Sequence, residues 1–291
     1  MNLDKMTMYQ AVKKAALEYP NGLAIYYRGK RISYRKLLND IDRMADIFYN
    51  VLGVRKDDVI LIAQPNIPDT LVMFYALNKI GAIVNFAHPF TPYNQIISIL
   101  GKTKSKYLLM FEQRIAKEVD KYREISDKIY VTRIENYLPC FSKAFYHCFM
   151  NNKIRKKLGK TKDFDGFKYV HDLKPTNKPV LECFDKLDQC SVLLHSGSTT
   201  GDPKTIMLND KGFNYITEHT DQILCIDWEK IKGIKMLNVL PSFHGFGLAM
   251  TMHLPLATKM GLVMIPKFTP KEVTKALKRT KFEVLCGVPT M

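Results

Sequence analysis

The sequence lacks the features that mark several classes of protein. Its six cysteines include no Cys-x-x-Cys pair and its histidines form no cluster at metal-ligand spacing, so neither a disulfide framework nor a zinc site is predicted. The opening Met1–Lys5 has no apolar signal-peptide core. RNA-recognition, zinc-finger and helix-turn-helix signatures are missing, as are repeats of solenoid period. We therefore expect a cytoplasmic protein with buried free thiols, and no nucleic-acid partner.

A stretch without formal charge, residues 236–258, does not have the pattern of a membrane span. Pro241 and Pro255 interrupt it, and Gly245 and Gly247 divide it further. A membrane helix needs about 20 predominantly apolar residues in a row. A buried strand, a loop and a core helix are therefore the better interpretation.

Acidic residues are few compared with basic ones. The 291 residues carry 44 Lys and Arg against 28 Asp and Glu, a formal net charge of +16. Such a charge favours anionic partners, among them nucleotides, coenzymes and membrane surfaces. The composition, 46% hydrophobic and 25% charged, is typical of a globular protein with one large domain or two ordinary ones.

Apolar runs alternate with amphipathic stretches along the chain. Ser33 is a candidate cap for a helix that ends near Gly53, and Pro68 opens a second helix that Gly81 closes. Val59–Ala63 is apolar throughout, as in a parallel strand covered on both faces. Further strands are expected near 82–86, 107–111, 128–132, 191–194, 235–240, 261–265 and 282–286, and further helices near 93–100, 113–124, 210–225, 247–257 and 270–279. This order predicts an α/β fold of doubly wound, mixed or parallel sheets with flanking helices, arranged as two stacked subdomains of which the second is truncated.

The alternation is interrupted once, which suggests three segments. We expect a first α/β subdomain at 1–136, an irregular basic insertion and linker at 137–190, and a second α/β unit at 191–291 that is incomplete at its C-terminus. Aromatic residues followed by a basic run make 137–162 a candidate for peripheral contact with an anionic membrane. A packed helix with a solvated basic tail is the interpretation we favour, because basic runs are usually solvated.

The polar loop at 195–204 reads His-Ser-Gly-Ser-Thr-Thr-Gly-Asp-Pro-Lys and lies between two apolar runs. Its glycines allow backbone amides to turn toward an anion, and Lys204 adds a positive charge. The loop therefore suits a polyphosphate. It is not a Walker A loop, because Asp202-Pro203 separates the second glycine from the lysine. A surface turn rich in Gly, Ser and Thr is the alternative.

Four places in the sequence resemble the AMP-forming adenylate synthetases, which include acyl-CoA synthetases, luciferases and the adenylation domains of peptide synthetases. They are Ile32–Leu37 with Leu52–Val59, Pro65-Asn66 with Ala76–Ala82, the polar loop with Pro203-Lys204, and the Pro-Ser-Phe-His segment at 241–244 with Gly287–Thr290. The resemblance extends from about residue 9 to the end of the sequence.

The resemblance implies ATP-dependent activation of a carboxylic acid to an acyl-adenylate and then to an acyl-CoA thioester. ATP and CoA would be substrates and Mg²⁺ the cofactor. The residues implied for binding the ATP phosphates are Ser196, Gly197, Ser198, Thr199, Thr200, Gly201 and Lys204, with Thr200 near Mg²⁺. Those implied for the acyl pocket are Phe243, His244 and Gly247. Neighbouring apolar residues favour a fatty or other apolar acid.

The sequence departs from the family pattern in two ways. Relatives have Ser-Gly-Thr-Thr-Gly where this chain has Ser-Gly-Ser-Thr-Thr-Gly, so the assignment of each hydroxyl to a phosphate stays open. The chain also ends before the family's aromatic-Gly-x-Thr-Glu segment and the domain with the catalytic lysine. We therefore expect no catalytic residue in this chain, little activity from it alone, and a sheet edge prone to aggregation.

Other functions remain open at this point. Within the same family, the protein would be an acyl-AMP ligase that supplies a carrier protein, or a peptide-synthetase adenylation domain. Outside catalysis, it would be a short nucleotide- or acyl-binding protein built on the same fold.

Overall fold

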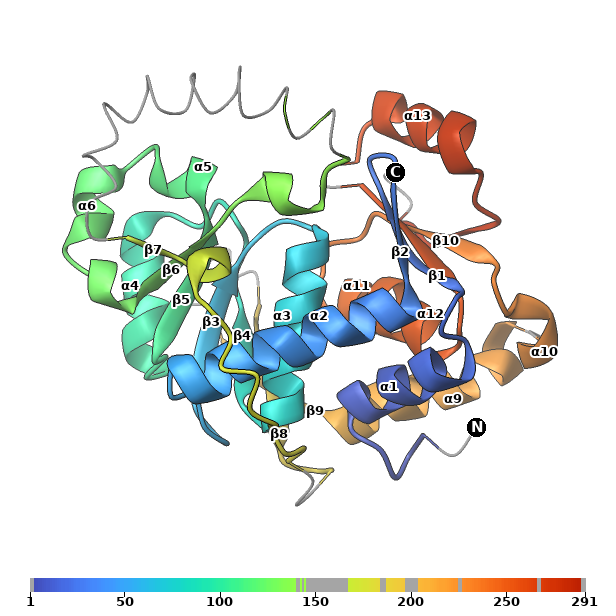
Figure 1. The fold of residues 1–291 in the computed structure, drawn as a ribbon, viewed down its shortest axis with the longest axis horizontal. Coiled ribbons are helices and arrows are strands. Elements are labelled where there is room, and N and C mark those ends of the chain that lie inside the picture. Colours follow the sequence, from blue (N-terminus) through green and yellow to red (C-terminus); the bar gives the residue numbers. More distant parts are fainter. Residues whose placement is uncertain are drawn as a thin grey trace.

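The computed structural model describes residues 3–139, 142, 144, 167–183, 187–196, 204–224, 227–265 and 268–288. Two sheets lie side by side, with helices between and around them (Figure 1). Within the described residues, no helix has both the length and the apolar character needed to cross a membrane.

The larger sheet has seven strands in the order β7-β6-β5-β3-β4-β8-β9. Neighbouring strands are parallel except β8 and β9, which form an antiparallel hairpin. The strands are β3 (Val59–Ala63), β4 (Ile83–Phe86), β5 (Tyr107–Phe111), β6 (Ile129–Thr132), β7 (Lys168–Tyr169), β8 (Cys190–His195) and β9 (Thr205–Asn209). β9 therefore forms an edge of the sheet as described.

The smaller sheet has five strands in the order β12-β10-β11-β1-β2. It is parallel except for the hairpin of β1 and β2. The strands are β1 (Leu23–Tyr27), β2 (Lys30–Ser33), β10 (Lys235–Asn238), β11 (Gly261–Met264) and β12 (Val284–Leu285). The first and last parts of the sequence thus share one sheet.

The helices supply the crossovers that parallel strands require. They are α1 (Met8–Glu18), α2 (Tyr34–Asp46), α3 (Pro68–Ile80), α4 (Tyr93–Lys102), α5 (Glu112–Ile115), α6 (Val119–Arg123), α9 (Asp210–Leu224), α10 (Trp228–Ile231), α11 (Gly245–Leu248), α12 (Leu254–Ala257) and α13 (Pro270–Thr280). A π-helical turn at Ile47–Val51 extends α2, and another at Ala249–His253 joins α11 to α12.

Local sequence explains where several helices begin. Thr7 and Gln10 form a reciprocal capping box at α1, and the Ser33 hydroxyl accepts a hydrogen bond from the Lys36 amide at 3.2 Å to cap α2. Pro68 is the first residue of α3, where its fixed φ and missing amide hydrogen fit a helix N-terminus. These caps agree with the helix starts predicted at Ser33 and Pro68.

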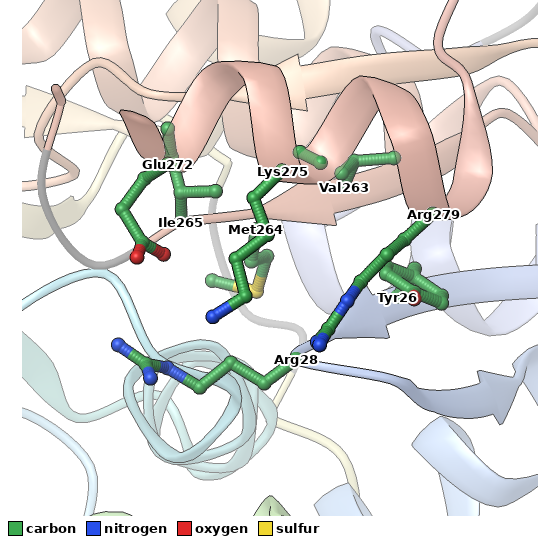
Figure 2. A pocket seen from close by; sticks show the side chains of 9 residues that line it. Tyr26, Arg28, Val263, Met264, Ile265, Glu272, Lys275 and Arg279 are labelled. Atoms are coloured by element: carbon green, nitrogen blue, oxygen red, sulfur yellow. The ribbon is translucent and has the colours of Figure 1, made fainter. Parts of the chain in front are cut away.

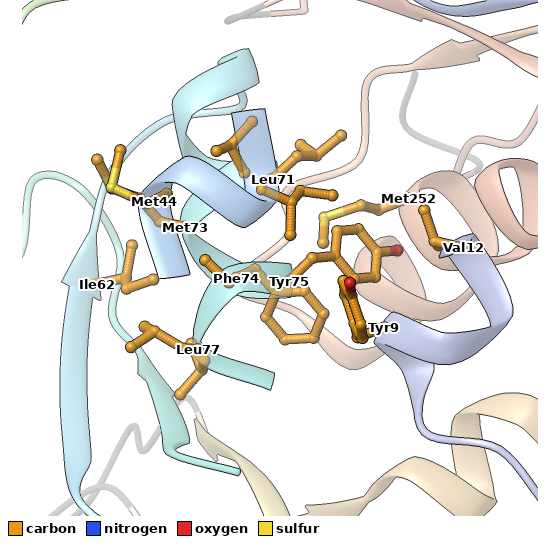
Figure 3. Packing of buried hydrophobic residues seen from close by; sticks show 14 of the residues in the cluster. Tyr9, Val12, Met44, Ile62, Leu71, Met73, Phe74, Tyr75, Leu77 and Met252 are labelled. Atoms are coloured by element: carbon orange, nitrogen blue, oxygen red, sulfur yellow. The ribbon is translucent and has the colours of Figure 1, made fainter. Parts of the chain in front are cut away.

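Every residue of α3 is buried, and this helix is the centre of the main core. Figure 3 shows its Leu71, Phe74 and Tyr75 among side chains from α1, α2, β3 and the π-turn, including Tyr9 and Met252. Burial of one such apolar side chain contributes about 1.5–3 kcal/mol. The core therefore joins the two sheets around a single helix.

Tyr34 provides a polar link within this core. Its hydroxyl is fully buried and donates to the backbone oxygen of Met260 at 2.6 Å. Burial raises the pKa of Tyr34 well above its usual value. The hydroxyl thus stays protonated and ties the start of α2 to the turn that leads into β11.

The predicted α/β class with parallel-rich sheets is confirmed. Strands expected at 59–63 and 107–111 have those bounds, and the uncharged stretch 236–258 contains the expected strand, loop and helix. One expected helix, 113–124, is instead two short helices, α5 and α6. The sequence reasoning did not anticipate α1 or the hairpin of β1 and β2.

The expected division of the chain at residues 136 and 190 stays a prediction. Strands from before residue 136 and after residue 190 occur in both sheets. Most of the basic segment 137–162, with its proposed membrane contact, lies outside the described residues.

Candidate functional site

Carboxyl ends of strands from both sheets meet at one place. His88 follows β4 of the larger sheet, and Phe243 and His244 follow β10 of the smaller sheet. The His88 and Phe243 rings lie edge to face with centroids 4.9 Å apart, and the His244 ring is 4.7 Å from that of Phe243. Ligands of open α/β sheets bind outside the carboxyl ends of strands. This junction is therefore the candidate site.

The polar loop starts and ends in the hairpin of β8 and β9. At its base the Ser196 amide donates to the Lys204 carbonyl at 3.0 Å, and the Lys204 amide donates to the Ser196 hydroxyl at 3.1 Å. The strands β8 and β9 therefore border the loop on its two sides. The predicted phosphate-binding residues Gly197, Ser198, Thr199, Thr200 and Gly201 lie outside the described residues.

His195, the last residue of β8, is fixed by a buried amide of β4. The Asn85 amide nitrogen donates to the hydroxyls of Thr103 and Ser105, at 3.0 and 3.3 Å. Its carbonyl oxygen is left to accept from Nε2 of His195 at 2.7 Å. Nδ1 of His195 is then the acceptor that faces the Thr205 hydroxyl, 3.4 Å away. The base of the polar loop is thereby connected to the interior of the larger sheet.

Asn66 fixes the Pro-Ser-Phe-His segment by hydrogen bonds to Leu240 and Ser242. Its side-chain oxygen accepts from both the amide and the hydroxyl of Ser242, at 3.0 and 3.1 Å. Its amide nitrogen donates to the Leu240 carbonyl at 2.7 Å. The side-chain groups of Asn66 and their partners in Ser242 and Leu240 are all buried, so leaving one of them unpaired would cost free energy. Asn66 therefore sets the backbone course that carries Phe243 and His244 to the junction.

Gly247 allows a close backbone approach beside the same segment. A Cβ atom at this position would lie 2.1 Å from the carbonyl oxygen of Pro241. Only a residue without a side chain fits there. Gly247 thus acts on the geometry of the predicted acyl pocket through packing.

The imidazoles at the junction are biased toward the neutral form. Burial lowers the pKa of His88, and the neighbouring His244 lowers it further. Burial also lowers the pKa values of His195 and His244. Near neutral pH these rings are uncharged, so they contribute shape and hydrogen bonds more than positive charge.

Lys204 is the cation at the base of the polar loop. In the part of the chain that the structure describes, its ammonium forms no salt bridge, and its side chain is exposed. A cation without a carboxylate partner at the end of a hydroxyl-rich loop fits a polyphosphate. Among the described residues, no group of three or more His, Cys, Asp or Glu is placed to hold a metal ion.

Three of these residues were proposed from the sequence, and two others were not. Phe243, His244 and Gly247 lie close together in the structure, and their assignment to an acyl pocket stays a prediction. Asn66 and Asn85 were not proposed. Each is a polar residue near the end of a buried strand, and this position was a signal that could have identified it.

Comparisons with known proteins identify the relatives of this chain. The profile of the family described as AMP-binding enzyme matches residues 12–291. A long-chain-fatty-acid–CoA ligase of Bacillus subtilis (strain 168) is 25% identical over 293 residues, which cover 99% of this chain and 51% of the relative. The peroxisomal trans-cinnamate:CoA ligase of Petunia hybrida is 23% identical, covering 100% of this chain and 49% of that protein.

A solved structure shows the same fold. The o-succinylbenzoate CoA synthetase (MenE) of Bacillus subtilis, in complex with ATP and magnesium ion, superposes with a TM-score of 0.69 at 16% identity. The match covers 94% of this chain and 62% of the synthetase chain. This chain spans about half the length of the curated relatives it matches.

Proposed function

Because this chain belongs to the family of AMP-binding enzymes, we propose that the protein activates a carboxylic acid with ATP and transfers the acyl group to CoA. One observation carries the proposal. The strand β8, which leads into the polar loop at Ser196, pairs with β4, and His88 after β4 packs against Phe243 of the other sheet's aromatic segment. A nucleotide at the loop and an acid beside Phe243 would then be neighbours.

The proposed reaction has two displacements. The carboxylate oxygen of the acid attacks the α-phosphorus of ATP, forming an acyl-phosphate bond while the bond to pyrophosphate breaks. The thiolate of CoA then attacks the acyl carbon, and AMP leaves. Phosphoryl chemistry of this kind asks the protein mainly to position reactants and to neutralise charge.

In this proposal the loop residues bind the phosphates. Ser196, Gly197, Ser198, Thr199, Thr200 and Gly201 would donate hydrogen bonds to the β- and γ-phosphates. Lys204 would offset negative charge, and Thr200 would approach Mg²⁺, which when bound would shield the phosphate oxygens. The Asn85–His195 hydrogen bond would hold the base of the loop in register during binding.

Phe243, His244 and Gly247 would form one wall of the acyl pocket. The neutral state of His88 and His244 makes this wall weakly polar, because a lowered pKa leaves both rings uncharged near neutral pH. A fatty or aromatic acid would lose little on entering it. This is the support for an apolar acid as substrate.

The test is acid-dependent exchange of labelled pyrophosphate into ATP, measured on the protein in the length that the cell makes. A panel of fatty and aromatic acids should support exchange. Lys204→Ala should reduce the rate about 10- to 100-fold, the value of a charge-assisted hydrogen bond. Lys211→Ala, an exposed lysine on α9, is the matched control and should leave the rate unchanged.

Exchange that is absent with every acid would contradict acid activation. ATP binding without exchange would instead favour the non-catalytic nucleotide-binding protein. An equal loss of rate in both lysine variants would show that overall charge matters and that Lys204 has no special role.

A further inference from the structure

A basic cleft is present on the smaller sheet, and the residues that line it differ from those of the junction described above. It is formed between α13 and the hairpin of β1 and β2, on one face of the smaller sheet (Figure 2). About 330 Å³ of space lies between its walls, a figure that includes the open solvent at its mouth, so the cleft is a shallow surface groove. None of its residues belongs to the candidate nucleotide loop or acyl pocket.

One face of α13 supplies charged side chains to this cleft. Glu272, Lys275 and Arg279 recur at intervals of three and four residues, which places them on the same side of the helix. Figure 2 shows Lys275 and Arg279 directed toward Arg28, which extends along the opposite wall. Three cations and one carboxylate therefore face a single cleft.

Arg28 occupies an unusual backbone position. It has a φ of 50° in the tight turn between β1 and β2, followed by Gly29 with a φ of 102°. Such turns favour Asn, Asp or Gly at the first position, and other residues are uncommon there. In this turn the Arg28 side chain extends along one wall of the cleft.

The cations of the cleft are not neutralised by the protein. In the described ranges neither Arg28, Lys275 nor Arg279 forms a salt bridge, and the one carboxylate, that of Glu272, leaves an excess of two positive charges. Unpaired arginines that converge on a concave surface are suited to bidentate contact with carboxylate or phosphate oxygens.

The floor beneath these charges is apolar. Tyr26, Val263 and Ile265 of the smaller sheet and Ala276 of α13 are all buried and line the cleft. A ligand with a short apolar body would contact the small part of this floor that solvent still reaches.

We propose that this cleft binds a small amphiphile, with an anionic carboxylate or phosphate head between Arg28 and Arg279 and a short apolar body on the floor. The site goes beyond the proposed acid activation, because it lies on other elements and uses none of the residues assigned to that reaction. Its occupant would be a free alkyl anion or the head of a larger lipid, which share this chemistry.

Isothermal titration with octyl phosphate, below its micelle concentration and at low ionic strength, tests the proposal. The double variant Arg28→Gln with Arg279→Gln should bind at least about ten-fold more weakly, since each charge-assisted contact is worth roughly that factor. The double variant Lys271→Gln with Lys278→Gln is the matched control: it removes the same charge from exposed positions of α13 outside the cleft. It should bind within about two-fold of the unchanged protein.

Two further ligands separate the parts of the proposal. Inorganic phosphate should bind more weakly than octyl phosphate, and octyl glucoside, which has no charge, should not compete with it. Equal affinity for phosphate and octyl phosphate would refute the apolar body, and competition by octyl glucoside would refute recognition of the anion. Vesicles containing an anionic phospholipid would identify a lipid head if they compete, and a free anion if they do not.

An unchanged affinity in the arginine variant, or an equal loss in both double variants, would overturn the site. Arg279→Gln alone serves as a second variant. Because this position is exposed, we expect the substitution to leave the fold intact. Pyrophosphate exchange should remain unchanged in all cleft variants. Failure of the proposed function would abolish exchange and leave these binding results interpretable.

Discussion

Single residues near the junction act through hydrogen bonds between uncharged groups. His195 is the clearest case, because Asn85 has one free acceptor and the imidazole supplies its donor. We expect His195→Leu to lower the free energy of unfolding by about 1 kcal/mol, since a buried acceptor loses its partner. ATP should also bind more weakly, because the base of the polar loop loses its attachment. Thermal unfolding and ATP titration would measure the two effects.

His195→Gln is the control for this prediction, because it retains a side-chain donor for Asn85. It should recover most of the stability and of the ATP affinity lost in the leucine variant. If glutamine and leucine give the same losses, the ring itself matters and the hydrogen bond does not.

His253 provides a prediction for pH dependence. It is fully buried, with Nε2 2.7 Å from the Asn214 side-chain oxygen and Nδ1 3.2 Å from the Tyr75 hydroxyl. Burial lowers its pKa from 6.5 to about 3. Below pH 6.5 the imidazole of His253 therefore binds a proton in the unfolded chain but not in the folded protein. Stability is lost as the pH falls. The loss between pH 6.5 and pH 5 should be about 2 kcal/mol.

Asp210 acts in the opposite direction over part of this range. Burial raises its pKa to about 6, although the Asn78 amide donates to both of its oxygens at 2.9 and 3.1 Å. The folded protein thus gains a proton before the unfolded chain does, so this group adds stability as the pH falls from about 6 toward 3.8. The free energy of unfolding will therefore change less with pH than the contribution of His253 alone predicts.

A variant isolates the histidine contribution. His253→Gln keeps a donor for Asn214 and does not titrate, so the stability difference between it and the unchanged protein should shrink by about 2 kcal/mol from pH 6.5 to pH 5. Denaturant unfolding at both pH values measures this difference. Parallel stability curves for the two proteins would show that His253 is charged or solvated in the fold.

At the scale of elements, the start of α11 is sensitive to one methyl group. In Gly247→Ala the new Cβ would meet the Pro241 oxygen at 2.1 Å, so the turn that carries Phe243 must shift. We expect a loss of about 1–3 kcal/mol in stability and a raised KM for the acid. Thermal unfolding and acid-dependent exchange would record both.

Gly245→Ala offers a matched control two residues earlier. Its Cβ would meet the Leu194 side chain at 3.4 Å, an ordinary contact. Stability and KM should change little in this variant. Similar damage from both alanines would mean that lost backbone freedom, and not the contact with Pro241, explains the effect.

Elements with strong local signals were predictable from the sequence. β3 is a run of apolar residues between turn signals, and α3 starts at a proline and ends at a glycine, so both bounds followed from local chemistry. β1 and β2 were missed because their stability depends on pairing β1 with β11, far along the chain. The helix expected at 113–124 breaks because Glu118, between α5 and α6, has an extended rather than helical φ.

The candidate site was predictable to a similar extent. The resemblance placed Phe243 and His244 beside the loop, because short motifs fix the order of segments. It did not place Asn85 against His195, since that contact joins residues of two strands that become neighbours only in the folded sheet. Residues that position others leave weaker local patterns than residues that contact substrates.

At the scale of the whole molecule, the edge strand β9 is a site for unwanted association. Met207 on this strand is 69% exposed, and its neighbour Ile206 is also exposed. Apolar edge strands invite pairing with other chains, and a lysine on the edge opposes it. We expect Met207→Lys to reduce aggregation on concentration, measured by light scattering, without lowering the unfolding temperature.

Leu181→Lys controls for the added charge. Leu181 is 87% exposed, but it lies outside every strand of the structure. This substitution should leave aggregation nearly unchanged. If both lysines reduce scattering equally, general charge repulsion and not the edge of β9 is responsible.

The pairing of β1 with β11 also affects when the chain can complete its fold during synthesis on the ribosome. Ile25 is made early, whereas its partner Leu262 is made near the end of this sequence. Until then one side of β1 has no neighbour, and the central helix lacks the Met252 side chain that covers part of it. The early segments therefore expose apolar surface until later synthesis supplies the residues that cover it. The yield of this protein in a cell should consequently depend on how quickly its last strands are made.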